Sequence, residues 1–282
     1  LMFGGSAHIP DYDTPLQLAG GENNAWTNND ITNYYLTVPK PNVETAFWLE
    51  SDRMLELAFS EQSLEVQRGV VMEEFKQRCL NQPYGDVGHL FRPLAFRVHP
   101  YRWPTIGKEL SHIEQATLDE VKSFFYRFYA PNNAVLAVTG NISWDETVKL
   151  TEKWFAPIPR RDVPVRQLPQ EPEQTQERRL TVERNVPLDA LFMGYHMCSR
   201  EGADYYAFDI LSDILSNGRS SRLNRRLVQE QNIFSGIDAY ISGTRDAGLL
   251  QISGKPAAGV SLEQAEAAVR KELEELQRSP VD

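Results

Sequence analysis

The chain has 282 residues, enough for two domains of ordinary size, and a composition typical of globular proteins. Its 29 Lys and Arg residues against 39 Asp and Glu residues give a net charge of -10, which argues against a nucleic-acid-binding surface. Its two cysteines, Cys79 and Cys198, do not suggest a disulfide framework. No apolar run approaches the roughly 18 residues that a membrane span requires. We therefore expect neither a nucleic-acid partner nor a membrane span.

The chain begins with a short apolar segment. Residues 1–6, LMFGGS, read as the end of an apolar helix that stops at two glycines. A helix without its beginning suggests a longer protein, and the last part of the chain also reads as an incomplete unit. We therefore expect the fold to be truncated at both ends.

Residues 20–38 predict a strand preceded by a candidate edge strand. Tyr34, Leu36 and Val38 share one face, which is typical of a half-buried strand. The residues of the candidate edge strand are Asn24, Ala25, Trp26 and Thr27. An edge strand can bind an extended peptide through its unpaired backbone groups. The same residues also fit a surface loop that leads into the sheet, and the pattern alone favours the loop.

An amphipathic helix is predicted over residues 41–58. Arg53 lies on its apolar line, together with Leu49 and Leu57.

A second helix, predicted over residues 63–79, places one of two adjacent carboxylates at the edge of the core. The residues of its apolar stripe are Leu64, Val71, Phe75 and Cys79. Gln67 and Glu74 line one flank of this stripe, whereas Glu73 points away from it. A carboxylate at a core edge needs a partner, because an unpaired buried charge is costly. That partner is either an Arg or Lys of a neighbouring element or a metal ion, and the helix pattern alone favours the ion pair.

The next elements predict the end of a first domain. Thr117 and Glu120 form a capping box that opens a helix. The residues expected on the buried face of that helix are Val121, Phe124, Phe125 and Phe128. Residues 134–139, AVLAVT, predict a short buried strand. Five prolines among charged residues and glutamines then predict a linker. We expect a first α+β unit over residues 1–156, a linker over 157–176 and a second α+β unit over 177–282.

The second unit shows a pattern that repeats the first. Its predicted strands cover residues 180–184, 190–196, 237–242 and 249–253, and its predicted helices cover residues 204–215 and 261–277. In both units an apolar strand ends at a glycine, Gly140 or Gly254, and a helix with a capping box follows. The boxes begin at Ser143 and Ser261. This suggests two copies of one α+β unit.

Several segments, taken in order, resemble the insulinase/pitrilysin family of zinc peptidases, which carry an inverted H-x-x-E-H motif. Residues 1–6 resemble the segment directly after that motif. NAWT at 24–27, followed by DITNY at 30–34, resembles the substrate-binding edge strand of the family. RGVVMEE at 68–74 resembles the segment that supplies the third zinc ligand, and LSNGRSSRL at 215–223 resembles part of the second repeat unit.

The resemblance implies a fold, a cofactor and a set of site residues. The fold is α+β, with two related units that each have an antiparallel sheet and helices packed on one side, as in mitochondrial-processing-peptidase-like metallohydrolases. The third zinc ligand falls on Glu74, and a position that is often acidic in the family falls on Gln67. The peptide substrate would lie along the residues from Asn24 to Thr27. Two motif histidines would complete the zinc site, and the motif glutamate would be the general base.

The implied function is zinc-dependent endopeptidase activity on peptides or unfolded polypeptides. H-x-x-E-H itself is absent from the sequence, and no two histidines stand at i and i+4. We therefore expect this chain alone to be inactive and to bind no catalytic zinc. The alternative is a non-catalytic partner of the same family that shapes a peptide-binding chamber. A second homologous half, fused or separate, is the expected partner, and the bacterial cell envelope or periplasm is favoured over the cytoplasm.

Overall fold

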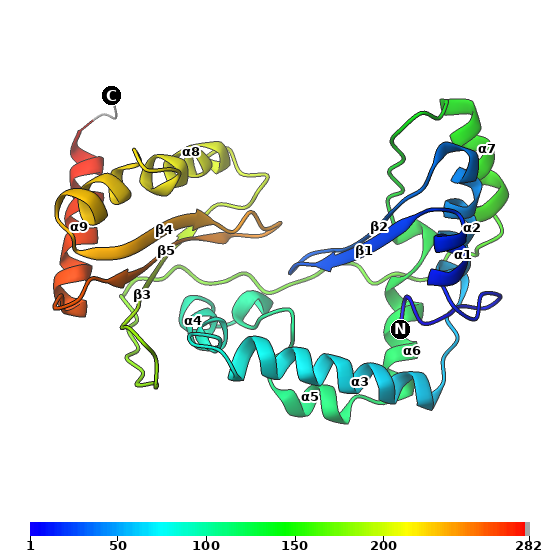
Figure 1. The fold of residues 1–282 in the computed structure, drawn as a ribbon, viewed down its shortest axis with the longest axis horizontal. Helices are drawn as coiled ribbons and strands as arrows, with labels where there is room; N and C mark the ends of the chain where they lie inside the picture. Colours follow the sequence, from blue (N-terminus) through cyan, green and yellow to red (C-terminus); the bar gives the residue numbers. More distant parts are fainter. Residues whose placement is uncertain (280–282) are drawn as a thin grey trace. The chain divides into compact units, whose positions relative to one another are not determined.

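The structure of the chain is a computed structural model that describes residues 1–279, and its helices and strands fall into two units (Figure 1). The first unit combines Leu1–Leu80 with Thr105–Pro169. The second combines Asn81–Pro104 with the residues from Gln170 onward. This division differs from the boundaries expected from the sequence, because it assigns Asn81–Pro104 to the second unit. Buried Phe96 and Tyr101 from this segment pack with Leu249 of the second unit, which explains the assignment.

The first unit contains a two-stranded antiparallel sheet and six α-helices. The strands are β1 (Glu22–Thr27) and β2 (Thr32–Thr37). The helices are α1 (Asp13–Leu18), α2 (Val43–Leu55), α3 (Glu61–Phe75), α5 (Leu110–Gln115), α6 (Leu118–Phe128) and α7 (Trp144–Phe155). Short 3-10 turns cover Lys40–Asn42 and Pro131–Asn133, and a π-helical segment, Lys76–Leu80, follows α3.

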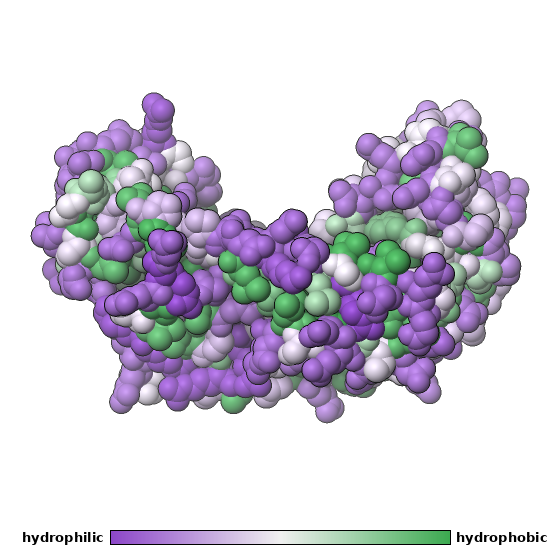
Figure 2. All heavy atoms as spheres, turned by 60° about the horizontal axis from the view of Figure 1, so that its bottom comes forward, coloured by the Kyte–Doolittle hydropathy of each residue, from purple (hydrophilic) through white to green (hydrophobic). Residues whose placement is uncertain are grey.

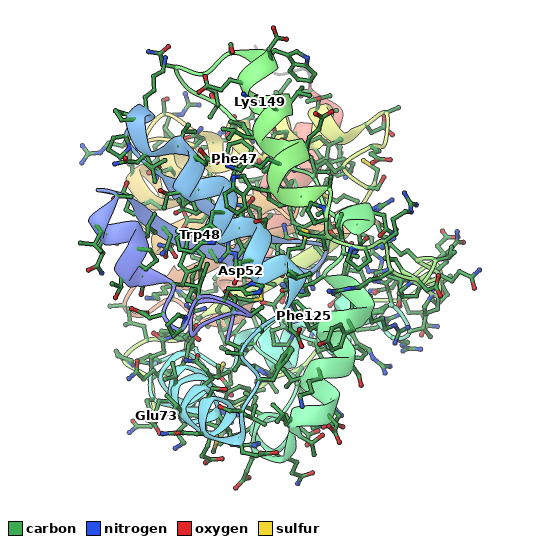
Figure 3. All side chains as sticks on the ribbon, turned by 90° about the vertical axis from the view of Figure 1, so that its right-hand side faces the viewer. Phe47, Trp48, Asp52, Glu73, Phe125 and Lys149 are labelled. Carbon is green, nitrogen blue, oxygen red and sulfur yellow. The ribbon has the colours of Figure 1, made fainter. Side chains whose placement is uncertain are left out.

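Helix α2 organises the core of the first unit. Its Leu49 is fully buried with Tyr12 and Leu16 from the region of α1. On another face of α2, the ring of Phe47 meets the ring of Phe155 from α7 edge-on, with centroids 6.5 Å apart. Figure 3 shows Phe47, Trp48 and Asp52 along this one helix. Because α2 contacts α1 on one side and α7 on another, it positions both.

The second unit contains a three-stranded antiparallel sheet of order β3-β5-β4. The strands are β3 (Leu191–Met197), β4 (Phe234–Ile241) and β5 (Gly248–Pro256). The helices are α4 (Val87–Ala95), α8 (Tyr205–Ser216) and α9 (Leu262–Arg278), with a π-helical segment, Asn224–Glu230, and a 3-10 turn, Pro100–Arg102. The fully buried side chains of its core include Leu215, Leu223, Leu227, Phe234, Ile252 and Val269.

Gly254 lies inside β5, where the sequence pattern predicted the end of the strand, so that prediction is wrong. A Cβ atom at Gly254 would stand 2.7 Å from a ring carbon of Phe234, which is closer than packed atoms approach. Glycine is therefore required here by the aromatic ring that covers β5, and not by a turn.

Two predicted strands are not formed in the described part of the chain. Residues 134–139 form no strand, and the side chain of Val135 is 96% exposed. Residues 180–184 also form none, and Leu180 is half-exposed. A strand is stable only when a neighbouring strand takes up its backbone hydrogen bonds and a core covers its apolar side chains. In the structure, neither segment has both a neighbouring strand and a core that covers its apolar side chains, although its sequence is strand-like.

Two further predictions about side chains and helices are wrong. Residues 1–6 form no helix, and Ser6 pairs with Leu57 in an isolated β-bridge. In α6 the ring of Phe125 is buried, as predicted, but Phe124 is 57% exposed. Figure 2 shows apolar side chains at the surface of both units. Adjacent positions on a helix lie about 100° apart, so α6 buries one of these two rings at the expense of the other.

Candidate functional site

The candidate peptide-binding residues lie on β1, which is a strand and not a loop. Within the described residues β1 pairs only with β2, so its other edge carries no strand. Asn24, Trp26 and Thr27 are exposed, and Ala25 is half-buried. The structure thus has an edge strand at these residues, where the sequence pattern alone favoured a surface loop.

The register of the hairpin shows which backbone groups face the open edge. Asn28 N–H donates to Ile31 O across the turn, and Thr27 is paired with Thr32 and Ala25 with Tyr34. Hydrogen-bonded and non-hydrogen-bonded pairs alternate along an antiparallel ladder. The backbone of Ala25 therefore points away from β2. In agreement, its N–H donates to the side-chain Oδ1 of Asn24 at 2.8 Å, an exposed contact that a peptide carbonyl could replace.

Glu74, the candidate metal ligand, lies in the last turn of α3. Ser60 and Ser63 fix the start of this helix through a reciprocal capping box. The Glu74 side chain is 40% exposed and forms an ion pair of 2.8 Å with Arg78, one turn further along and itself 67% exposed. Glu73, labelled in Figure 3, is 61% exposed. It forms an ion pair with Lys76. Exposed ion pairs within one helix contribute little to stability, so the fold does not depend on Glu74.

Gln67 lies two turns before Glu74 and lines a cavity of about 270 Å³. The rest of the cavity wall is formed by the start of the chain, the segment 57–60 and the first turns of α3. The lining residues are Leu1, Gly4, Leu57, Ala58, Ser60, Gln62, Ser63 and Val66. The structure therefore brings Gln67 next to the segment that follows the expected motif position.

The metal-ligand set is incomplete in this chain. Among residues 1–279, no three His, Cys, Asp or Glu side chains cluster closely enough to hold a metal ion. The buried His99 is engaged in the second unit, where its Nε2 lies 2.9 Å from Asp246 Oδ2. Glu74 thus supplies one carboxylate ligand at most. The residues present do not fit a catalytic zinc ion.

Asp52 and Arg53 of α2 are buried charged residues to which the sequence pattern gave no functional role. The Asp52 carboxylate accepts hydrogen bonds from Ser6 Oγ at 2.5 Å and from the backbone N–H of His8 at 3.0 Å, and its other oxygen lies 2.6 Å from His8 Nδ1. These contacts attach residues 6–8 to α2. The available sequence signal was a charged residue on the apolar line of a helix.

We expect Asp52 to make the stability of the first unit depend on pH. Burial raises the pKa of its carboxyl, but the hydrogen bonds from Ser6 and His8 outweigh burial and hold that pKa below its usual value. The stabilisation is therefore present above the unfolded-state pKa of about 3.9 and is lost as pH falls through the folded-state pKa. We expect Asp52→Asn to cost about 1–3 kcal/mol near neutral pH and less as pH approaches 3. Urea unfolding at several pH values measures this, and an equal loss at all pH values would contradict it.

Comparison with known proteins gives consistent matches. A family model described as Peptidase M16 inactive domain matches residues 115–282, and one described as Insulinase (Peptidase family M16) matches residues 1–89. Zinc protease PqqE of Helicobacter pylori is 31% identical over 228 residues, which cover 80% of this chain and 51% of that protein. This chain thus spans about half the length of that relative.

Solved structures share the fold. A protease from Helicobacter pylori superimposes with a TM-score of 0.91 at 27% identity, over 100% of this chain and 69% of that one. The periplasmic protease PqqL from Escherichia coli gives a TM-score of 0.74 at 18% identity, over 100% of this chain and 32% of that one. Among the described residues, no helix is long and apolar enough to cross a membrane.

Proposed function

Because the chain belongs to the insulinase family, peptidase family M16, we propose that its full-length protein is a zinc-dependent endopeptidase acting on peptides or unfolded polypeptides. In this proposal Glu74 is the third zinc ligand, and an H-x-x-E-H motif before Leu1 supplies two histidines and the general base. Zinc, when bound, would activate water and polarise the scissile carbonyl. The 282-residue chain alone lacks these groups and is inactive.

One observation carries the proposal: the fold does not use the Glu74 carboxylate. Its ion-pair partner is an exposed arginine of the same helical stretch, and not the Arg or Lys of a neighbouring element that a structural role predicts. A carboxylate that is partly exposed and weakly paired remains able to bind a cation. In family terms, Gln67, two turns before Glu74 on the same helix, would be a supporting residue whose amide replaces a carboxylate.

The second candidate function is a non-catalytic partner that shapes a peptide-binding chamber. Residues 115–282 favour it, because they match the family model of the inactive domain. The two candidates make opposite predictions for the residues before Leu1. An intact motif there supports the enzyme, and a degraded motif supports the partner subunit. In either case we propose a second homologous half, fused or separate, and a periplasmic location like that of PqqL.

The peptide-binding role of β1 is tested with Ala25→Pro. The Ala25 N–H faces the open edge, so proline removes a backbone donor that a peptide would use. It removes no hydrogen bond to β2, and edge strands tolerate proline at such a position. We expect the affinity for a labelled unstructured peptide to fall about tenfold, as for one lost backbone hydrogen bond. Circular dichroism should remain unchanged.

The matched control is Ala25→Ser, which keeps the backbone donor at the same position. We expect it to bind the peptide like the unchanged protein. Equal binding by the proline and serine variants would show that peptides do not pair with this edge.

A further inference from the structure

Arg53 of α2 is a buried cation enclosed by three aromatic rings. The residue is 2% exposed. Its guanidinium carbon lies 4.5 Å from the ring centroid of Tyr34, 4.7 Å from that of Tyr12 and 5.2 Å from that of Phe3. Cation–π contacts are stronger where the cation is desolvated, as it is here.

The hydrogen bonds of Arg53 use only part of its guanidinium group. Its Nε and Nη2 donate to the carboxylate of Glu50, and Tyr12 OH donates to the same carboxylate at 2.7 Å. Its Nη1 is buried and has no hydrogen-bond partner among the residues that the structure describes. Burying an arginine with an unused donor is unfavourable for the free energy of folding. Replacing a buried charged residue with an apolar side chain of similar size often leaves the protein at least as stable. Core filling alone therefore does not explain Arg53.

The three rings come from three separate segments. Phe3 belongs to residues 1–6, Tyr12 precedes α1, and Tyr34 lies on β2. Tyr34 is directly opposite Ala25 in the hairpin register, and its hydroxyl lies 2.7 Å from that of Tyr129. One planar cation thus contacts both the first residues of the chain and the strand behind the open edge.

We infer that Arg53 is a positioning residue that fixes the open edge of β1 relative to residues 1–6. It acts through the ring of Tyr34, which supports Ala25 from the neighbouring strand. The inference rests on the proposed function, in which residues 1–6 directly follow the zinc-binding motif and β1 binds the peptide. Arg53 then holds β1 in the arrangement that binds the peptide, although it contacts neither the peptide nor the hydrolytic centre.

The first test is hydrogen–deuterium exchange of the 282-residue chain with Arg53→Lys, which keeps the charge but loses the planar contacts. We expect the amides of β1 and β2 to exchange at least about tenfold faster, while those of β3–β5 stay unchanged as an internal reference. Tyr34→Phe is the matched control, because it removes the hydroxyl and keeps the ring, and we expect a much smaller effect. Unchanged exchange in the lysine variant would overturn the inference. If Arg53→Lys does not fold, Tyr34→Leu removes the same contact from the other side, and the same local acceleration is expected.

The second test uses the protein extended before Leu1 to include the motif. Arg53→Lys should raise KM for an unstructured peptide about tenfold, with kcat and zinc content close to those of the unchanged protein. A purely structural role would instead reduce the amount of active enzyme and leave KM unchanged, and that result would overturn the inference. If the unchanged extended protein binds no zinc and cleaves nothing, the proposed function fails, but the exchange experiment still decides whether Arg53 positions β1.

Discussion

Glu74→Gln is expected to abolish zinc binding and peptidase activity in a protein that is extended before Leu1 to include the expected motif. An amide is a much poorer zinc ligand than a carboxylate, and it leaves the metal with two protein ligands instead of three. Loss of a group that only supports a ligand typically costs 10–100-fold, so kcat/KM should fall by more than about a hundredfold. Zinc content by elemental analysis and peptide cleavage measure the two effects.

Glu73→Gln is the matched control for this experiment. Glu73 is the adjacent residue on α3, is more exposed than Glu74, and forms a comparable ion pair with Lys76. We expect its substitution to change neither zinc content nor activity. If both variants keep zinc and activity, Glu74 is only a surface ion-pair residue.

Phe234→Ala is expected to unfold the second unit at much lower urea concentration. Phe234, the first residue of β4, is fully buried in the core of the second unit, and its ring covers Gly254. Removing a buried phenylalanine ring typically costs about 3–5 kcal/mol, because both transfer energy and packing are lost. That is a large share of the stability of a domain. Unfolding followed by exchange of the β3–β5 amides separates this effect from any change in the first unit.

Tyr240→Ala on the same strand provides the comparison for Phe234→Ala. The Tyr240 side chain is 49% exposed, so its removal opens no closed cavity. We expect it to cost much less than Phe234→Ala. Equal losses from the two variants would contradict the assignment of the core to one face of β4.

Local sequence signals predicted the helices well. The capping boxes at Thr117 and Ser261 are formed as expected, because each pairs a side chain with backbone groups only three residues away. The segments 134–139 and 180–184 have the composition of strands but depend on distant partners that a local pattern cannot specify. Strand pairing is a property of the whole fold, which is why these two predictions were wrong.

In the candidate site, the sequence predicted the orientation of the two carboxylates on α3 but not the contacts of Arg53. Helical geometry alone placed Glu74 at the flank of α3 and Glu73 on its outer side, and the exposed fractions agree with this order. The role of Arg53 was not predictable from spacing, because the three rings around it come from segments up to 31 residues apart in the chain. The one sequence feature that pointed to Arg53 was its position on the apolar line of a predicted helix.

The most direct test of the proposed function is the zinc content of the extended protein beside that of the 282-residue chain. We predict one zinc ion per molecule, with cleavage of an unstructured peptide, for the extended protein, and neither zinc nor cleavage for the chain alone. Absence of zinc from the extended protein would contradict the peptidase assignment and would identify the protein as a non-catalytic partner of its family.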